Sequence, residues 1–149
     1  MSDQKSKIQV LIVDDDEMIR DFLGIFLQEN FDIRKAGNGQ EAYNILKESN
    51  FTEPPDVVIL DINMPVMNGI ELLQELRSKK CMIPVIVISG LPEYQIENLN
   101  VFDVMSKPID LKRLESNIYA AIELDESNII SNSLYALSKA RTFVNSIVL

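Results

Sequence analysis

The run Val57-Val58-Ile59-Leu60-Asp61 decides the fold, because four apolar residues, three of them β-branched, lead directly into an acid. A continuous apolar run of this length, preceded by the Pro54-Pro55 breaker, predicts a strand from Asp56 to Leu60 that is buried on both faces. Strands of this kind occur in parallel sheets covered by helices on both sides. The acid after the run then lies at the carboxyl end of a strand, where open α/β sheets bind their ligands.

Similar runs on both sides of this strand predict the rest of the sheet. Buried strands are expected at Ile8 to Val13 and Ile83 to Ile88, and shorter or edge strands at Phe31 to Ala36 and Val101 to Met105. Helical patterns separate them. The first is capped by Asp16 and has an apolar face of Ile19, Phe22, Leu23, Phe26 and Leu27.

Four more helices complete the pattern. Two open at the cap-like residues Asn38 and Asn68, a weak one covers Glu93 to Leu99, and the last turns Leu111, Leu114, Ile118 and Ile122 inward. Five strands alternating with five helices predict an α/β fold, a flavodoxin-like (βα)5 doubly wound parallel sheet with strand order 2-1-3-4-5. This unit is expected to span residues 7–124.

The amino-acid composition argues against several classes of function. The net charge of −9 disfavours direct binding to nucleic acid, because phosphate backbones repel an acidic surface. The absence of histidine excludes Ser-His-Asp catalysis and imidazole-based zinc sites. No apolar run is long enough to span a bilayer, and no signal peptide is evident. The single cysteine, Cys81, is expected to be a plain structural thiol and cannot form an intrachain disulfide. Together these features predict a cytoplasmic protein.

Polar side chains follow four of the predicted strands: the Asp14-Asp15 pair, Asp61, Ser89 and Lys107. Each alone is compatible with a helix cap or an ordinary turn, but the fold brings all four strand ends to one edge of the sheet. Two carboxylates about 4 Å apart repel by roughly 4 kcal/mol at an effective dielectric of 20, so such a cluster requires a cation or a proton. Oxygen ligands favour Mg²⁺ (or Mn²⁺), which shares its shell with phosphate oxygens.

The remaining groups suit a phosphoryl ligand. Lys107 offers a point charge and Ser89 a hydroxyl donor. The backbone N–H groups of Asn63 and Gly90 can complete the cage, and a glycine lets the backbone come close.

Four motifs resemble those of bacterial two-component response-regulator receiver domains, in particular stand-alone, chemotaxis-type receivers. They are the acidic pocket Val13-Asp14-Asp15-Asp16, the phosphoacceptor segment from Asp61 to Gly69, the hydroxyl-bearing strand from Val85 to Gly90, and the lysine motif Ser106-Lys107-Pro108. The resemblance covers about residues 7–124.

The resemblance implies a role for each site residue. Asp61 would accept a phosphoryl group from a histidine kinase or a histidine phosphotransfer protein. Asp15, Asp61 and the carbonyl of Asn63 would bind Mg²⁺, with Asp14 acting through water, and Lys107 and Ser89 would contact the phosphoryl oxygens. The Lys107-Pro108 bond would be cis. The chain would be no enzyme apart from its own phosphorylation and dephosphorylation, and it would signal by contact with a downstream protein.

Two positions depart from the family pattern. An aromatic residue that swings inward on phosphorylation is replaced by Val104, and the small residue common before this strand is Asn100. Either the switch that links Ser89 to output is muted, or Phe102 or Tyr94 replaces the aromatic residue.

The segment 127–149 forms a predicted C-terminal helical extension. It has Lys139, Arg141 and no acid, and an apolar series at Ile130, Leu134, Leu137, Val144 and Val148. The helix either packs on its own domain or pairs with a partner or a second copy as a homodimer. As a third alternative, its positive charge docks it on the acidic domain and masks the output face.

Two other functions are compatible with parts of the pattern. A Mg²⁺-dependent phosphohydrolase also forms an aspartyl phosphate, but such enzymes typically have a second acid two residues after the nucleophile, where this chain has Asn63. A degenerate receiver that binds partners without phosphate would not need the complete set of acids, Ser89 and Lys107.

Overall fold

The computed structural model describes residues 7–51, 53–90 and 100–126. Five parallel strands form one sheet in the order β2-β1-β3-β4-β5, as the sequence predicts. The strands are β1 (Ile8–Val13), β2 (Phe31–Ala36), β3 (Val57–Asp61), β4 (Val85–Ser89) and β5 (Asp103–Ser106). The helices are α1 (Glu17–Leu27), α2 (Gly39–Glu48), α3 (Gly69–Ser78) and α4 (Leu111–Glu126).

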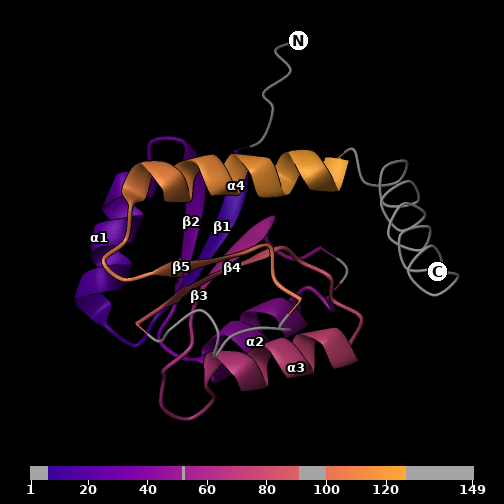
Figure 1. Ribbon diagram of the computed structural model, residues 1–149. Helices are drawn as coiled ribbons and strands as arrows, with labels where there is room; N and C mark the ends of the chain where they lie inside the picture. Colours follow the sequence, from indigo (N-terminus) through magenta and orange to yellow (C-terminus); the bar gives the residue numbers. More distant parts are fainter. Residues whose placement is uncertain (1–6, 52, 91–99, 127–149) are drawn as a thin grey trace, which may run out of the picture.

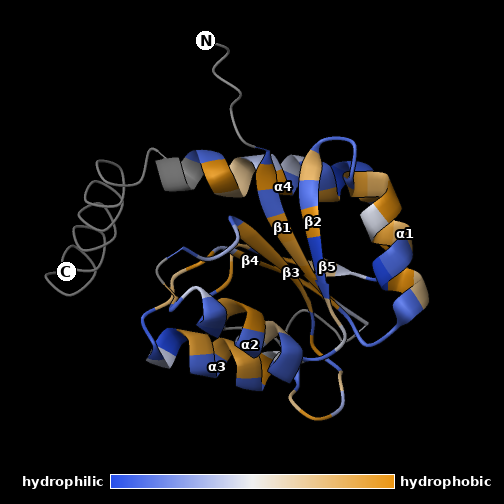
Figure 2. Ribbon diagram, turned by 180° about the vertical axis from the view of Figure 1, so that it is seen from behind, coloured by the Kyte–Doolittle hydropathy of each residue, from blue (hydrophilic) through white to orange (hydrophobic). Residues whose placement is uncertain are grey.

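The helices cover the sheet in two layers, with α1 and α4 on one face and α2 and α3 on the other (Figure 1). Side chains of a strand alternate between its faces, so each central strand feeds two cores. In β1, Val10 and Ile12 pack with α1 and α4, whereas Leu11 and Val13 pack with α2 and α3. All five residues of β3 and of β4 are buried, as the continuous apolar runs predict. Both strands have mainly hydrophobic colours in Figure 2.

Strands β1 and β2 have the predicted bounds, whereas those of β3, β4 and β5 differ from the predicted ones by one or two residues. Strand β4 begins at Val85 because Pro84 has no N–H for the ladder, although its carbonyl still accepts a bond from the N–H of Val58 (3.0 Å). Strand β5 is also shorter than predicted, from Asp103 to Ser106. The predicted helix from Glu93 to Leu99 and the extension 127–149 lie outside the described residues.

The prediction that Phe22 faces inward is wrong. This side chain is 57% exposed, whereas Leu23 and Leu27 are buried and Ile19 and Phe26 are partly buried. Each residue of a helix turns by about 100°, so Phe22 lies on the flank of the face that these four residues form. It joins Met18 and Ile25, which are also exposed. Among the described residues, no helix is long and apolar enough to cross a membrane.

The three predicted helix caps are confirmed. The Asp16 carboxylate accepts from the N–H groups of Met18 (2.9 Å) and Ile19 (3.4 Å). The side-chain oxygens of Asn38 and Asn68 each accept from the N–H three residues later, at 2.9 Å in both helices. Each cap starts a helix immediately after a loop at the carboxyl edge of the sheet, and so fixes where the chain leaves that edge.

Gly69 allows α3 to start against the end of β3. A Cβ built at this position would lie 2.5 Å from the carbonyl oxygen of Asp61 and 2.9 Å from the Cα of Ile62, both backbone atoms. The N–H of Gly69 donates to the carbonyl of Ile62 (2.9 Å), which holds the two segments together. The glycine is therefore needed for this close approach beside Asp61.

We expect Gly69→Ala to lower the free energy of unfolding by about 1–3 kcal/mol, because the new methyl group forces the backbone after Asp61 to move. Gly90→Ala is the matched control, since a Cβ there meets no atom within 4 Å. Urea denaturation of both variants measures the difference. Equal stabilities for the two variants would contradict the role of Gly69.

Candidate functional site

Three carboxylates meet at the carboxyl edge of the sheet. Asp61 is the last residue of β3 and Asp14 directly follows β1; the two strands are paired up to Val13 and Leu60, which places the acids at adjacent strand ends. Asp14 is 3% and Asp61 6% exposed, whereas Asp15 is exposed. One oxygen from each of the three lies within 4.8 Å of the others. The acids that the sequence places at two strand ends are thus a single cluster.

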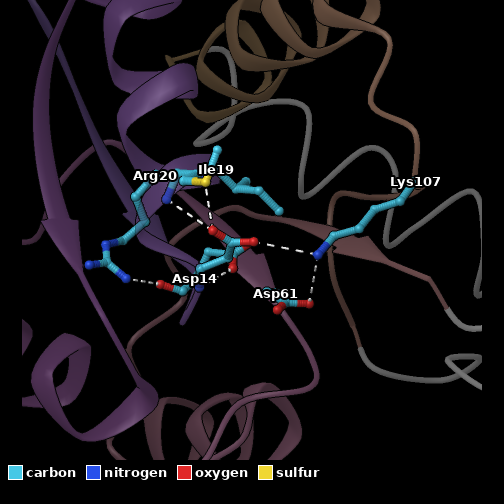
Figure 3. Close-up of polar contacts among 7 residues, drawn as sticks. Asp14, Ile19, Arg20, Asp61 and Lys107 are labelled. Atoms are coloured by element: carbon cyan, nitrogen blue, oxygen red, sulfur yellow. Dashed lines mark hydrogen bonds and ion pairs between the residues drawn. The ribbon is translucent and has the colours of Figure 1, made fainter.

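Lys107 reaches this cluster from beyond β5. Its Nζ lies 3.6 Å from Oδ2 of Asp14 and 3.7 Å from Oδ1 of Asp61 (Figure 3). The backbone N–H of Lys107 donates to the carbonyl of Ser89 (3.0 Å), which ties the start of the loop to the end of β4. The Lys107-Pro108 peptide bond is cis, as the resemblance implies. One ammonium group therefore bridges two buried carboxylates.

The charges at this edge are incompletely balanced. Burial is the main cause that raises the pKa of Asp61, and the nearby carboxylates of Asp14 and Asp15 raise it further, against the lowering effect of Lys107. Burial also raises the pKa of Asp14, against a backbone hydrogen bond from Asp16 (2.9 Å) and the charge of Lys107. Both acids therefore favour a bound proton or cation more than an exposed aspartate does.

Ser89 and Asn63 lie next to Asp61. Ser89 is fully buried and ends β4, whose preceding residue, Ile88, pairs with Asp61 in the sheet. The backbone N–H of Asn63 bonds to the Asp61 carboxylate and lowers its pKa, while the Asn63 residue as a whole is exposed. Gly90 is exposed, and a Cβ built at this position would meet no atom within 4 Å. Steric crowding by the described residues therefore does not require a glycine here.

The sequence reasoning missed two features of the site. Arg20 of α1 donates from Nη1 to the backbone carbonyl of Asp14 (2.7 Å) and holds the β1–α1 loop (Figure 3). One sequence feature could have drawn attention to Arg20: it is the only basic residue among the five acids of residues 14–21. Val66, in the loop after Asp61, has a φ of 69° and is largely exposed. A β-branched residue in this conformation is strained, and no sequence pattern announces it.

The residues next to β5 clarify the departures from the family pattern. Val104 is partly buried against the core on the α2–α3 side, whereas Phe102 packs against the core on the α1–α4 side. Phe102 thus lies against the opposite core from the position of the missing aromatic residue. Tyr94 lies outside the described residues. Asn100 has a φ of 47°, a conformation that asparagine tolerates better than most non-glycine residues.

Comparison with known proteins shows the family of this chain. The family model of the response regulator receiver domain matches residues 10–119. A protein-glutamate methylesterase/protein-glutamine glutaminase from Clostridium acetobutylicum is 37% identical over 130 residues, which cover 79% of this chain and 36% of that protein. The chain spans between a quarter and about half of the length of the curated relatives that it matches.

Solved structures show the same likeness. The receiver domain of a Francisella response regulator is 31% identical with a TM-score of 0.71, over 78% of this chain and 98% of that one. The response regulator protein TrrA from Thermotoga maritima, solved in complex with Mg(2+)-BeF, is 30% identical with a TM-score of 0.65, over 76% of this chain and 97% of that one. The chain therefore belongs to the response regulator receiver domain family.

Proposed function

We propose that this chain is a signalling receiver that accepts a phosphoryl group on Asp61 in a Mg²⁺-dependent reaction. The observation that carries the proposal is the meeting of Asp61 with Asp14 and with the ammonium group of Lys107, at 3.7 Å from the Asp61 carboxylate. An acyl phosphate formed here adds negative charge to a site that already holds three carboxylates. The site therefore needs both a fixed cation and a metal ion.

The donor set fits Mg²⁺. Hard, oxygen-rich sites of a few carboxylates suit this ion, which keeps several waters and shares phosphate oxygens. We assign direct ligation to Asp15, Asp61 and the carbonyl of Asn63, and a water-mediated role to Asp14; Mn²⁺ has the same donor preference. The relative TrrA, solved with Mg(2+)-BeF, supports this assignment. When bound, the ion neutralises charge on the phosphoryl oxygens.

The chain's own residues position the reaction. An Asp61 oxygen attacks phosphorus as the bond from phosphorus to the donor's imidazole nitrogen breaks, and the nitrogen keeps the electron pair and takes a proton. Lys107 and the Ser89 hydroxyl contact the phosphoryl oxygens, together with the N–H groups of Asn63 and Gly90. Transfer of this kind depends mainly on positioning and charge neutralisation, which a preorganised edge supplies.

The histidine in this reaction must come from another protein, because the chain has none. We propose a histidine kinase or a histidine phosphotransfer protein as donor, and output by contact with a downstream protein rather than with nucleic acid. The receiver domain extends over residues 7–124, and a cytoplasmic location fits its buried free thiol, Cys81. The chain catalyses only its own phosphorylation and dephosphorylation.

The output switch is expected to differ from that of receivers with an aromatic residue at the position of Val104. A valine side chain has one χ angle and no ring to swing between the surface and the interior. Phe102, packed against the other core, does not replace it. We therefore propose that Ser89 transmits the phosphorylation state with a muted change at β5.

Incubation with Mg²⁺ and acetyl phosphate is expected to add one phosphoryl group, detected by intact-mass measurement. Asp61→Ala should abolish the adduct, and Lys107→Ala should slow its formation roughly 100-fold, the scale of losing one group that stabilises developing charge. Asp32→Ala, at an exposed acid of β2, is the matched control and should react like the wild type.

Two outcomes would contradict this assignment. An adduct that persists in Asp61→Ala moves the acceptor to another residue. Repeated turnover of a small phosphate ester such as p-nitrophenyl phosphate would favour the phosphohydrolase, whereas a receiver only labels itself and slowly loses the label.

We expect Asp14→Asn to raise the free energy of unfolding of the metal-free protein at pH 7. Because the pKa of Asp14 is raised in the folded state, its stabilising contribution is present below the ordinary pKa and is lost as the pH rises through the raised value. The asparagine keeps the oxygen that accepts from Asp16 but carries no charge. The gain should be about 1–3 kcal/mol, the scale of the desolvation penalty of a buried polar group, because burial is the largest cause of the raised pKa of Asp14.

Chemical denaturation in a metal chelator between pH 4 and pH 7 measures this difference, which should shrink as the pH falls. Added Mg²⁺ should stabilise the wild type by about 2.7 kcal/mol at a concentration 100 times its dissociation constant, and should stabilise Asp14→Asn by less. A variant that is less stable than the wild type at pH 7, or indifferent to pH, would show that Asp14 carries no electrostatic cost.

A further inference from the structure

Helix α1 has an apolar stripe on its outer face. Met18 is 81%, Phe22 57% and Ile25 66% exposed. They follow one another by four and three residues, so they line one side of the helix. Single exposed apolar residues are ordinary, but three of the six large exposed apolar side chains among the described residues share this helix. Such a stripe indicates a surface that another segment covers.

The sequence around the stripe is negatively charged. Residues 14–29 contain six acids, Asp14, Asp15, Asp16, Glu17, Asp21 and Glu29, and one base, Arg20, which gives a net charge of −6 + 1 = −5. Asp21 pairs with Lys35 of β2 (2.8 Å), but Glu17 and Glu29 form no ion pair with a described residue. A segment that covers the stripe should therefore be apolar and positively charged.

The segment 127–149 of the same chain has both properties. It carries Lys139 and Arg141 without any acid, and its apolar series runs from Ile130 to Val148. At 100° per residue, Arg141 falls within the same narrow face as Leu137 and Val144. An arginine inside an apolar seam needs an acidic partner on the surface that the seam covers. The acids beside the α1 stripe provide such partners.

We propose that residues 130–148 form an amphipathic helix that packs on the α1 stripe of their own domain, with Arg141 facing its acids. This does not depend on the proposed phosphorylation. Helix α4 starts near α1 and runs away from it over about 24 Å (Figures 1 and 2). A helix over residues 130–148 is about 28 Å long, so after a turn at 127–129 it reaches back to α1. Tyr119 of α4 is 40% exposed and forms a tilted ring contact with Phe31 of β2, with ring centroids 5.2 Å apart.

The contact also places the segment beside the site. Helix α1 begins one residue after Asp16, next to the exposed Asp15 of the acidic cluster. A helix on the stripe therefore flanks the edge where Asp61 is approached.

Methionine oxidation tests the contact in the full-length chain. Met82 is 62% exposed and serves as the internal reference, because without a cover Met18, at 81%, should oxidise at least as fast. In dilute hydrogen peroxide, followed by peptide mass spectrometry, we expect Met18 to oxidise several-fold more slowly than Met82. The double variant Leu137→Ser/Val144→Ser should bring Met18 to the rate of Met82 or above it, and Arg141→Glu should do so in part.

A control variant and protein dilution complete the test. Asn132→Ser/Ser146→Asn changes the opposite side of the proposed helix and should leave Met18 protected. The two cores formed by the described residues keep their own side chains in every variant, so all variants should remain folded, which circular dichroism checks. Equal oxidation of Met18 and Met82 in the wild type would overturn the proposal. Protection that disappears on dilution would overturn it in favour of a second copy of the chain as the occupant.

Discussion

The conflict between two buried carboxylates at adjacent strand ends is the constraint on which the rest of this structure depends. Asp14 and Asp61 are almost completely removed from water, and burial together with their mutual repulsion raises the pKa of Asp61. A protein keeps such an arrangement only where surrounding contacts hold it in place. Here the rigid neighbours are β1 and β3, whose apolar side chains fill two cores on opposite faces of the sheet. The packing of the sheet thus offsets the free-energy cost of burying the two carboxylates.

Lys107 neutralises part of the negative charge of the two carboxylates and leaves the rest unbalanced. Its ammonium group lies at 3.6 and 3.7 Å from the two carboxylates, close enough for attraction but longer than the best charge-assisted hydrogen bonds. One positive charge cannot neutralise three negative ones, which supports the proposed binding of a divalent cation. With the cation in place, the edge would accept a phosphoryl group whose charge would otherwise be repelled.

Much of the fold could be predicted from the sequence because β3 and β4 are buried on both faces and contain only apolar residues before their terminal polar residue. The caps Asp16, Asn38 and Asn68 were recognisable for a similar reason, since their bonds are local. Local pattern did not determine which residues of α1 face inward, because the edge of an apolar face depends on the angle at which a helix packs. Phe22 is the clearest example: it lies at the edge of the apolar face, and the packing of α1 on the sheet leaves it exposed.

Each site residue could be identified from the sequence, but the hydrogen bonds that fix the surrounding backbone could not. Arg20 binds the backbone carbonyl of Asp14, and Arg77 of α3 donates to the carbonyls of Cys81 (2.7 Å) and Asn100 (3.0 Å). Backbone carbonyls occur in every residue, so no side-chain pattern reveals these partners. Asn100 shows the complementary case: an apparent departure from the family pattern is explained by its left-handed backbone conformation.

The most direct test of the central claim locates the acyl phosphate at a single residue. Borohydride reduction of the protein treated with Mg²⁺ and acetyl phosphate converts a phosphorylated aspartate to homoserine, which tandem mass spectrometry can assign to a position. We expect homoserine at position 61 and unmodified aspartate at positions 14 and 15. Homoserine at position 14 or 15, or none in a sample that carries phosphate, would contradict Asp61 as the phosphoryl acceptor.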